Sequence, residues 1–227
     1  MLEKKYIPSV MSDLRHEIVE VPANIKHCSG IKVYGRRIKS VIFTTDVSII
    51  ANNNADAVLA VYPFTPNPAI LKSIMQVASV PVFAGVGGGL TTGDRSANMS
   101  LFAESEGAFA AVVNAPTDVQ TIRTINKMID IPIIYTVVSD KADIASRIEA
   151  GVDILNVSGG SQTAAIVADI RKSYPYFPIM ATGGPSLESV EETIAAGANA
   201  ITFTPPSNAE LFKIKMDKYR RTEEKGY

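Results

Sequence analysis

Short glycine runs stand beside hydroxyl-bearing residues at three places in the sequence, within GVGGGLTT, SGGS and TGGPS. Glycine allows backbone N–H groups to approach an anion closely, and a helix that begins just after the run adds a partial positive charge. Such a site holds a phosphate without lysine or arginine. The candidate phosphate-binding residues are Gly87, Gly88, Gly89, Gly159, Gly160, Gly183, Gly184 and Ser207.

A structural interpretation of the same runs competes with the phosphate site. Each glycine pair also suits a tight corner between a strand and a helix, and the neighbouring serines suit helix caps. One run alone would favour that interpretation. Three runs in one chain favour anion binding.

Two aspartates are the candidate catalytic residues. Asp46 follows the first of eight predicted strands and Asp140 follows the fifth, and these strands face each other if the eight close into a barrel. Two opposed carboxylates act as acid and base on a ligand held between them. Both aspartates also stand where a helix N-cap belongs, so capping is the alternative interpretation.

Other chemistries lack their residues at the predicted strand ends. His16 and His27 both lie in the first 37 residues, and no lysine directly ends a predicted strand, which argues against a histidine-rich metal site and a Schiff-base lysine. The glycine run lacks the third glycine of the dinucleotide fingerprint, and no GxxxxGK[ST] motif is present. We therefore expect no metal and no cofactor.

Eight strand–helix units must position these residues. The predicted strands read as continuous apolar runs, as parallel strands covered by helices do, and each is followed by a helical pattern. Strict alternation favours an α/β fold, and eight units in one chain favour a (β/α)8 barrel over an open doubly wound sheet. The strands are predicted at residues 41–45, 57–62, 80–84, 109–113, 131–138, 153–157, 177–181 and 200–204.

The sequence thus predicts one domain, a barrel over residues 38–227, preceded by an N-terminal extension over residues 1–37. A helix is predicted at residues 12–21, where Leu14 and Ile18 share a face. Such an extension either plugs the N-terminal end of the barrel or docks on a neighbouring subunit. The second option implies a homo-oligomer.

Composition excludes several classes of protein. With 46% hydrophobic and 20% charged residues and a net charge of -1, the chain is too apolar for disorder and too neutral for broad electrostatic binding to nucleic acid or an anionic membrane. The single cysteine, Cys28, cannot form an internal disulfide. The sequence contains no apolar stretch of ~20 residues and no signal-peptide core. We expect a cytoplasmic protein that binds a small anionic molecule.

Two segments resemble phosphate-binding barrels. Residues 81–92 (PVFAGVGGGLTT) with 112–115 (VVNA) resemble the strand 3–4 half of the histidine-biosynthesis barrels. Residues 178–206 (PIMATGGPSLESVEETIAAGANAITFTPP) are similar to the strand 7–8 phosphate segment of ribulose-phosphate-binding barrels and of glycerol-uptake-operon antiterminators.

The resemblance implies a phosphate site at Gly183, Gly184 and Ser207, with a second at the glycine triplet. It also implies catalytic aspartates at the ends of strands 1 and 5, near Asp46 and Asp140. One departure is the pair Pro205-Pro206, which removes two backbone donors from the last loop.

The leading functional hypothesis is an enzyme, a lyase or isomerase, that acts on a small phosphorylated metabolite by acid–base chemistry. One alternative is a hydrolase of a small ester or amide, in which an aspartate activates water. The other is a ligand-sensing regulator of the antiterminator type, which binds its metabolite without turnover.

Overall fold

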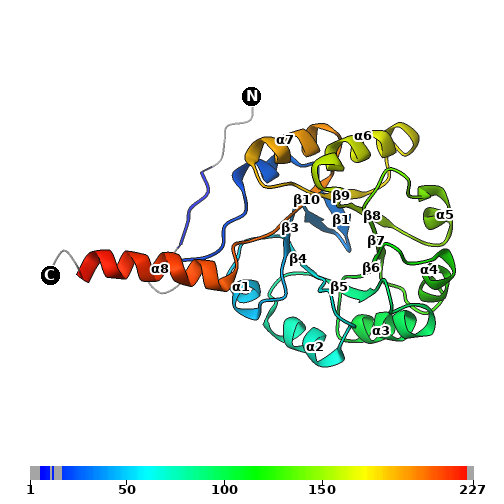
Figure 1. The fold of residues 1–227 in the computed structure, drawn as a ribbon, viewed down its shortest axis with the longest axis horizontal. Helices are drawn as coiled ribbons and strands as arrows, with labels where there is room; N and C mark the ends of the chain where they lie inside the picture. Colours follow the sequence, from blue (N-terminus) through cyan, green and yellow to red (C-terminus); the bar gives the residue numbers. More distant parts are fainter. Residues whose placement is uncertain (1–5, 11, 13–16, 224–227) are drawn as a thin grey trace.

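The computed structural model describes residues 6–10, 12 and 17–223. Eight parallel strands close into a barrel, in the order β10, β3, β4, β5, β6, β7, β8 and β9, and a helix follows each strand (Figure 1). The predicted (β/α)8 barrel is confirmed. The strands are β3 (Ser40–Phe43), β4 (Ala57–Ala60), β5 (Val82–Gly87), β6 (Ala110–Asn114), β7 (Ile133–Val137), β8 (Ile154–Val157), β9 (Ile179–Thr182) and β10 (Ala200–Phe203). The helices are α1 (Val47–Ala51), α2 (Pro68–Val77), α3 (Gly93–Ser105), α4 (Val119–Asn126), α5 (Ile144–Glu149), α6 (Thr163–Ser173), α7 (Leu187–Ala195) and α8 (Asn208–Glu223).

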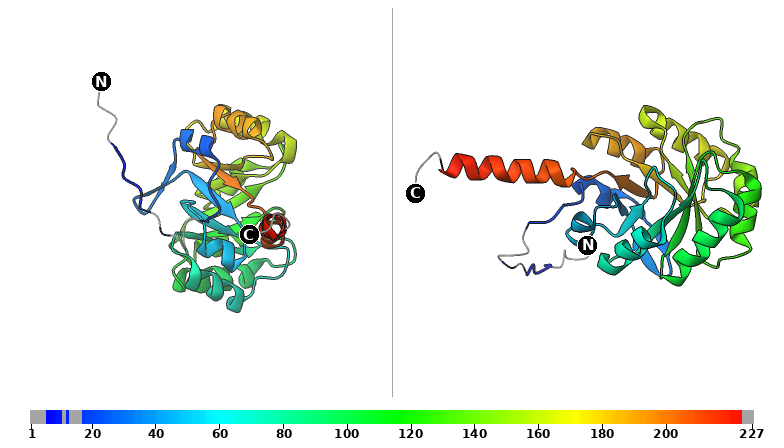
Figure 2. Two further views of the ribbon diagram at one scale, coloured as in Figure 1. Left: turned by 90° about the vertical axis from the view of Figure 1, so that its left-hand side faces the viewer. Right: turned by 60° about the horizontal axis from the view of Figure 1, so that its bottom comes forward.

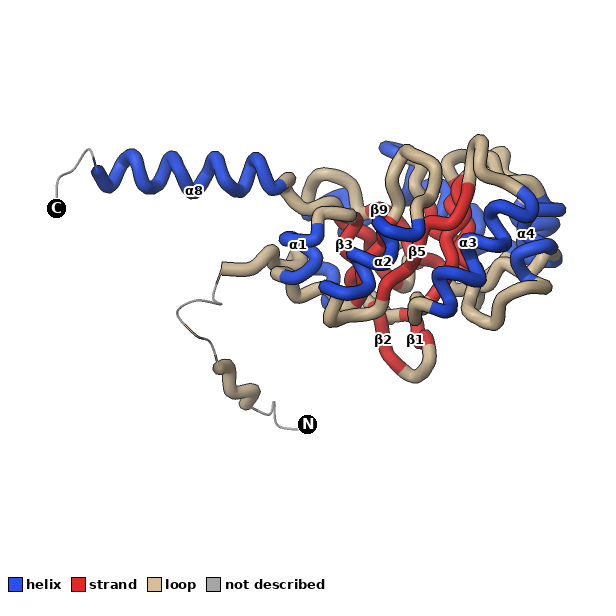
Figure 3. The backbone as a smooth tube through the Cα atoms, turned by 90° about the horizontal axis from the view of Figure 1, so that it is seen from below, coloured by secondary structure: helices blue, strands red, loops and turns tan. Residues whose placement is uncertain are grey.

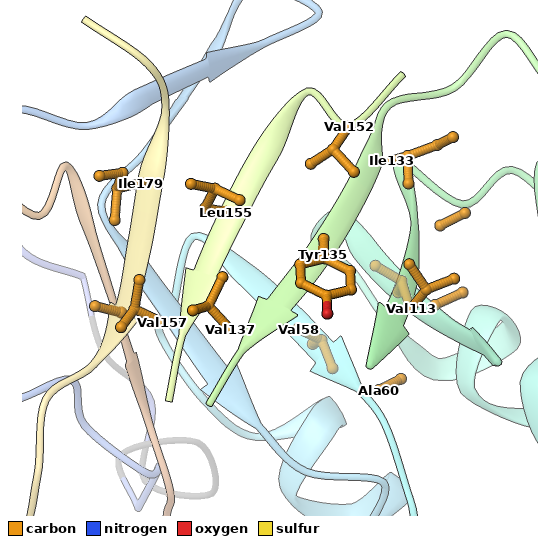
Figure 4. Close-up of a cluster of buried hydrophobic side chains, with 14 of the residues drawn as sticks. Val58, Ala60, Val113, Ile133, Tyr135, Val137, Val152, Leu155, Val157 and Ile179 are labelled. Atoms are coloured by element: carbon orange, nitrogen blue, oxygen red, sulfur yellow. The ribbon is translucent and has the colours of Figure 1, made fainter. Parts of the chain in front are cut away.

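Side chains along each barrel strand alternate between two apolar cores. Outward-facing residues such as Leu155 and Tyr135 pack against the helices, and Figure 4 shows part of this outer core. Inward-facing residues such as Phe83 and Ile134 fill the barrel. The guanidinium of Arg147 stacks over the ring of Tyr135, 5.3 Å from its centroid, so this tyrosine is a packing residue.

A hairpin closes the N-terminal end of the barrel. Strands β1 (Ile31–Val33) and β2 (Arg36–Ile38) pair antiparallel, and the hairpin projects from the end of the barrel where the strands begin (Figure 3). The apolar side chains of Ile31, Val33 and Ile38 belong to the inner core. Of the two roles expected for the extension, the structure therefore provides the plug.

The helix predicted at residues 12–21 is not found in the described residues. Residues 13–16 lie outside the described part of the chain, and residues 17–21 are not helical. Val19 instead forms a parallel bridge with Asn53, directly after α1. The backbone groups expected to bond within a helix thus bond to the barrel.

The N-terminal segment takes the place that an eighth barrel helix normally fills. The short 3-10 helix η1 (Ala23–His27) packs on α7, and the side chain of Asn24 donates to the carbonyl of Leu187 over 2.8 Å. Ile25 and Cys28 are buried in the outer core, and burial raises the pKa of the Cys28 thiol to about 11. With this position filled, α8 extends away from the barrel (Figures 1 and 2).

The same type of hydrogen bond connects three pairs of neighbouring strands at the N-terminal end of the barrel. A side-chain oxygen directly before the later strand accepts the backbone N–H at the start of the earlier one. The bonds run from Ser40 to Asp56 (2.9 Å), from Ile133 to Asp153 (2.9 Å) and from Ile179 to Asn199 (3.0 Å).

No helix in the described residues is both long enough and apolar enough to cross a membrane.

Candidate functional site

A ring of uncharged polar side chains lines the C-terminal end of the barrel. Because their strand neighbours face the helices, Asn114, Thr136, Asn156, Thr182 and Thr202 point inward, above the apolar inner core. They come from five adjacent strands, β6 to β10. The other half of the barrel places Phe43, Val61 and Gly85 at the equivalent inward positions, so one side of the mouth is polar and the other apolar.

Two polar atoms of this ring are buried without a partner. Asn156 is 4% exposed and Thr202 is 3% exposed. The Asn156 amide nitrogen donates to the hydroxyl of Thr136 over 3.2 Å, but Asn156 Oδ1 and Thr202 Oγ1 have no hydrogen-bond partner among the described residues. Buried polar atoms of folded proteins are nearly always paired. Asn156 Oδ1 and Thr202 Oγ1 are therefore two unsatisfied polar atoms at the C-terminal end of the barrel.

The first cavity of the mouth, cavity A, lies over the loops that follow β4, β5 and β6 and has a volume of about 490 Å³. Tyr62 and Phe64 form its apolar wall, and Asn114 from the polar ring lies at its edge. The loop after β5 lines the rest. The backbone N–H groups of Gly89 and Leu90 in that loop make no hydrogen bond within the described part of the chain, so they are available to an anion.

The second cavity of the mouth, cavity B, lies at the ends of β9 and β10 and has a volume of about 500 Å³. The ring hydroxyls of Thr182 and Thr202 line it, together with Gly184, Ser186 and Thr204. It adjoins the first turn of α7, where Ser186 and Ser189 form a capping box and Glu188 places a carboxylate beside the partial positive charge of the helix. Cavity B therefore combines three threonines and a glycine corner with an apolar part formed by Pro22, Leu187, Val190 and Phe203.

Several of the predicted glycines have a packing reason for their identity. A Cβ atom would lie 2.1 Å from Ser96 Oγ at Gly87, 2.4 Å from Ile166 Cδ1 at Gly159 and 2.7 Å from Val190 Cγ2 at Gly183. These three glycines allow a helix to approach its strand closely. Their presence alone is thus no argument for a phosphate.

The remaining glycines differ from these three in conformation. Gly88, Gly89, Gly160 and Gly184 all adopt positive φ angles, and at Gly89 and Gly160 nothing lies within 4 Å of an added Cβ. Gly88 and Gly89 line cavity A, and Gly184 lines cavity B. Neither cavity includes Gly159 or Gly160.

Ser207 already has a partner at the start of α8. Its backbone N–H and its hydroxyl donate to the carboxylate of Glu210 over 2.8 and 2.7 Å, and the serine hydroxyl keeps the pKa of Glu210 below its usual value. A carboxylate thus occupies the place where a phosphate would approach this helix. Ser207 lines neither cavity A nor cavity B.

The structure shows a local role for Asp46. Its Oδ1 atom accepts hydrogen bonds from the Ser48 hydroxyl (2.6 Å) and from the backbone N–H groups of Ser48 (2.8 Å) and Ile49 (3.3 Å). These bonds, the hydroxyl bond first, hold the pKa of Asp46 below its usual value. Asp46 is therefore the N-cap of α1 and stays ionised at neutral pH.

Asp140 is placed differently. It is exposed and lines a separate cavity of about 270 Å³ between α5 and α6, beside Asp143 and Asp169. Asp143, rather than Asp140, caps α5. β3 and β7, which precede Asp46 and Asp140, are opposite in the closed barrel, but the two carboxylates share no cavity. Their action as a catalytic pair stays a prediction.

Sequence reasoning placed none of the five ring residues in the candidate site, and Thr136 and Thr202 show why. Both lie inside predicted strands, where threonine is common because it is β-branched. The signal that could have found them is the alternation of inward-facing and outward-facing side chains along a strand. Each is two residues after an inward-facing apolar residue, Ile134 and Ala200 respectively, so each had to face the same interior.

The site and fold together define a (β/α)8 barrel with a neutral, two-cavity mouth at the C-terminal ends of its strands. The sequence matches no protein-family model and no curated protein. Solved structures do match it. One is a phosphonopyruvate hydrolase with oxalate and Mg²⁺ (14% identity, TM-score 0.58, covering 86% of this chain and 96% of that chain).

Two further matches are enzymes of the same fold. A 2,3-dimethylmalate lyase of the PEP mutase/isocitrate lyase superfamily has 15% identity and a TM-score of 0.60, over 82% of this chain and 81% of that chain. A mandelate oxidase variant has 14% identity and a TM-score of 0.60, over 87% and 71%. At these identities the likeness establishes the barrel fold. The superfamily named in these matches differs from the ribulose-phosphate-binding barrels expected from the glycine segments.

The donor set of the mouth does not suit the Mg²⁺ held by the phosphonopyruvate hydrolase structure. Within the described ranges, no group of three or more His, Cys, Asp or Glu residues is placed to hold a metal ion. The mouth offers amide and hydroxyl oxygens, whereas divalent magnesium is generally bound through carboxylates.

Proposed function

We propose that this chain is an enzyme of the lyase or isomerase type that acts on a small phosphorylated metabolite at the C-terminal end of its barrel. The observation that carries the proposal is cavity B, where the buried, unpartnered hydroxyl of Thr202 lies beside Thr182 and Gly184 at the N-terminus of α7. Hydroxyl and backbone donors at a helix start suit the oxygens of a phosphate.

The rest of the ligand extends toward the centre of the mouth. Asn156 Oδ1 accepts hydrogen bonds only, so it requires a donor such as a hydroxyl group on the ligand. Tyr62 and Phe64 of cavity A would then shield the far end of the ligand from water. The names of two structural matches, a phosphonopyruvate hydrolase and a 2,3-dimethylmalate lyase, support small acidic substrates for this fold.

Proton transfer is assigned to Asp46 and Asp140. The lowered pKa of Asp46 keeps the carboxylate ionised and therefore able to accept a proton, and it also makes the carboxylate a weaker base. Asp140, across the barrel after β7, would turn from its separate cavity toward the mouth and donate a proton of its own. The proton taken by Asp46 would pass to solvent. A carboxylate that must also cap α1 acts through its second oxygen, Oδ2, because Oδ1 holds the cap.

A thermal-shift screen tests the binding step. Inorganic phosphate and a panel of phosphorylated metabolites of three to six carbons are compared with their dephosphorylated counterparts. A ligand at 100 times its Kd adds about 2.7 kcal/mol of stability, which raises the Tm of a chain of this size by roughly 5–10 °C. The proposal fails if every phosphorylated compound shifts the Tm no more than its dephosphorylated counterpart.

Substitution of the two aspartates tests the catalytic step with a metabolite that the screen identifies. Asp46→Asn and Asp140→Asn are each expected to lower kcat at least 100-fold, because general acid–base catalysis contributes about 10²–10⁴-fold. KM should change little. Asp143→Asn, which alters the cap of α5, is the matched control and should keep its turnover. Full turnover in both test variants would refute the assigned pair.

A second candidate function is ligand sensing without turnover. The observation that favours it is the neutrality of the ring, since Asn114, Thr136, Asn156, Thr182 and Thr202 carry no charge and cannot exchange protons near neutral pH. Tight binding of a phosphorylated metabolite that is recovered unchanged after prolonged incubation would select this function over the enzyme.

A further inference from the structure

The last helix, α8, stands free of the barrel, and Figures 1 and 2 show it running outward from the end of β10. Large apolar side chains are exposed along it, with Phe212 and Ile214 each 65% exposed and Tyr219 49% exposed. A helix of 16 residues is marginally stable in water unless it packs on another surface. The barrel cannot provide that surface, because residues 23–28 already occupy the position of an eighth helix.

An apolar groove lies beside the first two turns of α8. Its volume is about 540 Å³, and it is lined by Ile18 and Val19 of the N-terminal segment, Ile49 of α1, and Leu211 and Phe212 of α8. Glu17 and Lys215 form an ion pair at the groove. The groove and the exposed apolar side chains of α8 (Phe212, Ile214 and Tyr219) therefore form one continuous surface.

We propose that this surface binds a second copy of the chain, with the two α8 helices antiparallel around a twofold axis. In such a contact each helix lies along the groove of the other copy. A surface that carries both the groove and the helix that fills it is self-complementary, as a twofold contact requires.

The charges of α8 select the antiparallel arrangement. Glu210, which also accepts hydrogen bonds from Ser207, lies in the first turn of the helix. Arg220, which is ion-paired with Asp217, and Arg221 lie in the last turn. Antiparallel packing brings the acidic start of each helix to the basic end of the other, twice per dimer, whereas parallel packing would bring like charges together. The helix dipoles also favour the antiparallel arrangement.

Light scattering after size-exclusion chromatography tests the contact with the full chain. The wild-type chain is expected at twice its mass of 24.3 kDa. Phe212→Asp and Ile214→Asp place a charge in the contact and should each give a monomer that still unfolds cooperatively on heating, as a folded barrel does. Tyr176→Asp alters an equally apolar residue that is 96% exposed in the loop after α6, and it should remain a dimer. A wild-type monomer at about 100 µM overturns the proposal.

A charge exchange tests the orientation. Glu210→Lys alone, and Arg220→Glu with Arg221→Glu, each create like charges at both ends of an antiparallel homodimer, so each variant is expected to be monomeric. A mixture of the two variants restores opposite charges at both ends and should form heterodimers. Failure of the mixture to associate, or dimers in either variant alone, contradicts the antiparallel contact.

Discussion

Replacing Arg171 with alanine is expected to lower the free energy of unfolding by about 3–5 kcal/mol, because a charged side chain loses several hydrogen bonds, each worth about 1.5–3 kcal/mol before solvent exposure is considered. Its guanidinium donates to the carbonyls of Gly197 (2.9 Å), Tyr174 (3.1 Å) and Phe177 (2.6 Å). It also donates to Asn199 Oδ1 over 2.6 Å, and partial burial lowers its pKa.

These acceptors explain why the expected loss is large. They belong to the connection between α6 and β9 and to the connection between α7 and β10, so one side chain holds both connections together. Asn199 also accepts the backbone N–H of Ile179 and donates to the hydroxyl of Ser29. Without Arg171, the bonds of Asn199 to β9 and to the N-terminal segment lose their support.

Urea unfolding of three variants measures the effect. Lys172→Ala removes the neighbouring cation, which makes only an exposed ion pair with Asp169, and should cost less than about 0.5 kcal/mol. Arg171→Lys keeps the charge but loses the planar fork, so its stability should fall between that of the wild type and that of Arg171→Ala. A loss below 1 kcal/mol in Arg171→Ala would show that the network is dispensable.

The barrel itself was predictable because its physical causes are local. Parallel strands buried on both faces must be apolar throughout, and this pattern recurs eight times with a helical segment after each run. The differences are small and lie at element ends. The run predicted at residues 131–138 forms β7 over Ile133–Val137.

The placement of the two chain ends was not predictable from local pattern. The sequence predicts a helix at residues 209–224, and α8 forms there, but the pattern does not say what the helix packs against. That outcome depends on contacts between residues far apart in the sequence. Ile25 and Cys28 occupy this part of the outer core, and the last helix extends away from the barrel (Figures 1 and 2).

The structure places the predicted glycines, and their binding of an anion stays a prediction. Gly87, Gly88 and Gly89 line cavity A and Gly184 lines cavity B, and at Gly87 and Gly183 a helix also packs close to the glycine. The same residue type serves both purposes, and spacing alone does not separate them. Ser207 was chosen by analogy, and its bonds to Glu210 depend on a side chain three residues later.

The double substitution Thr182→Val with Thr202→Val is expected to abolish phosphate binding while the fold stays at least as stable. Thr202 Oγ1 is buried without a partner, and valine has the same shape as threonine without the hydroxyl. Removing an unsatisfied buried polar atom stabilises a fold by about 1 kcal/mol. The Thr182→Val substitution offsets part of this stabilisation, because it removes the hydrogen bond that the Thr182 hydroxyl donates to the Ser158 hydroxyl over 3.2 Å.

The affinity for phosphate should fall in the same double variant whose fold stability does not. The loss of two hydroxyl contacts to a charged ligand, each worth about 1.5–3 kcal/mol, lowers affinity at least 100-fold. Isothermal titration with inorganic phosphate and with the best compound of the screen measures affinity, and thermal unfolding without ligand measures stability. A site that evolved to hold a ligand carries polar groups that cost the empty fold stability, so the two measurements should move apart.

Thr193→Val is the matched control for this prediction. Thr193 is also buried, at 3% exposure, but its hydroxyl donates to the carbonyl of Ser189 over 2.8 Å within α7. Its replacement should lower stability by about 1 kcal/mol and leave phosphate affinity unchanged. If the double variant binds phosphate as well as Thr193→Val does, the threonine hydroxyls of cavity B do not bind the anion, and the phosphate site lies elsewhere in the mouth.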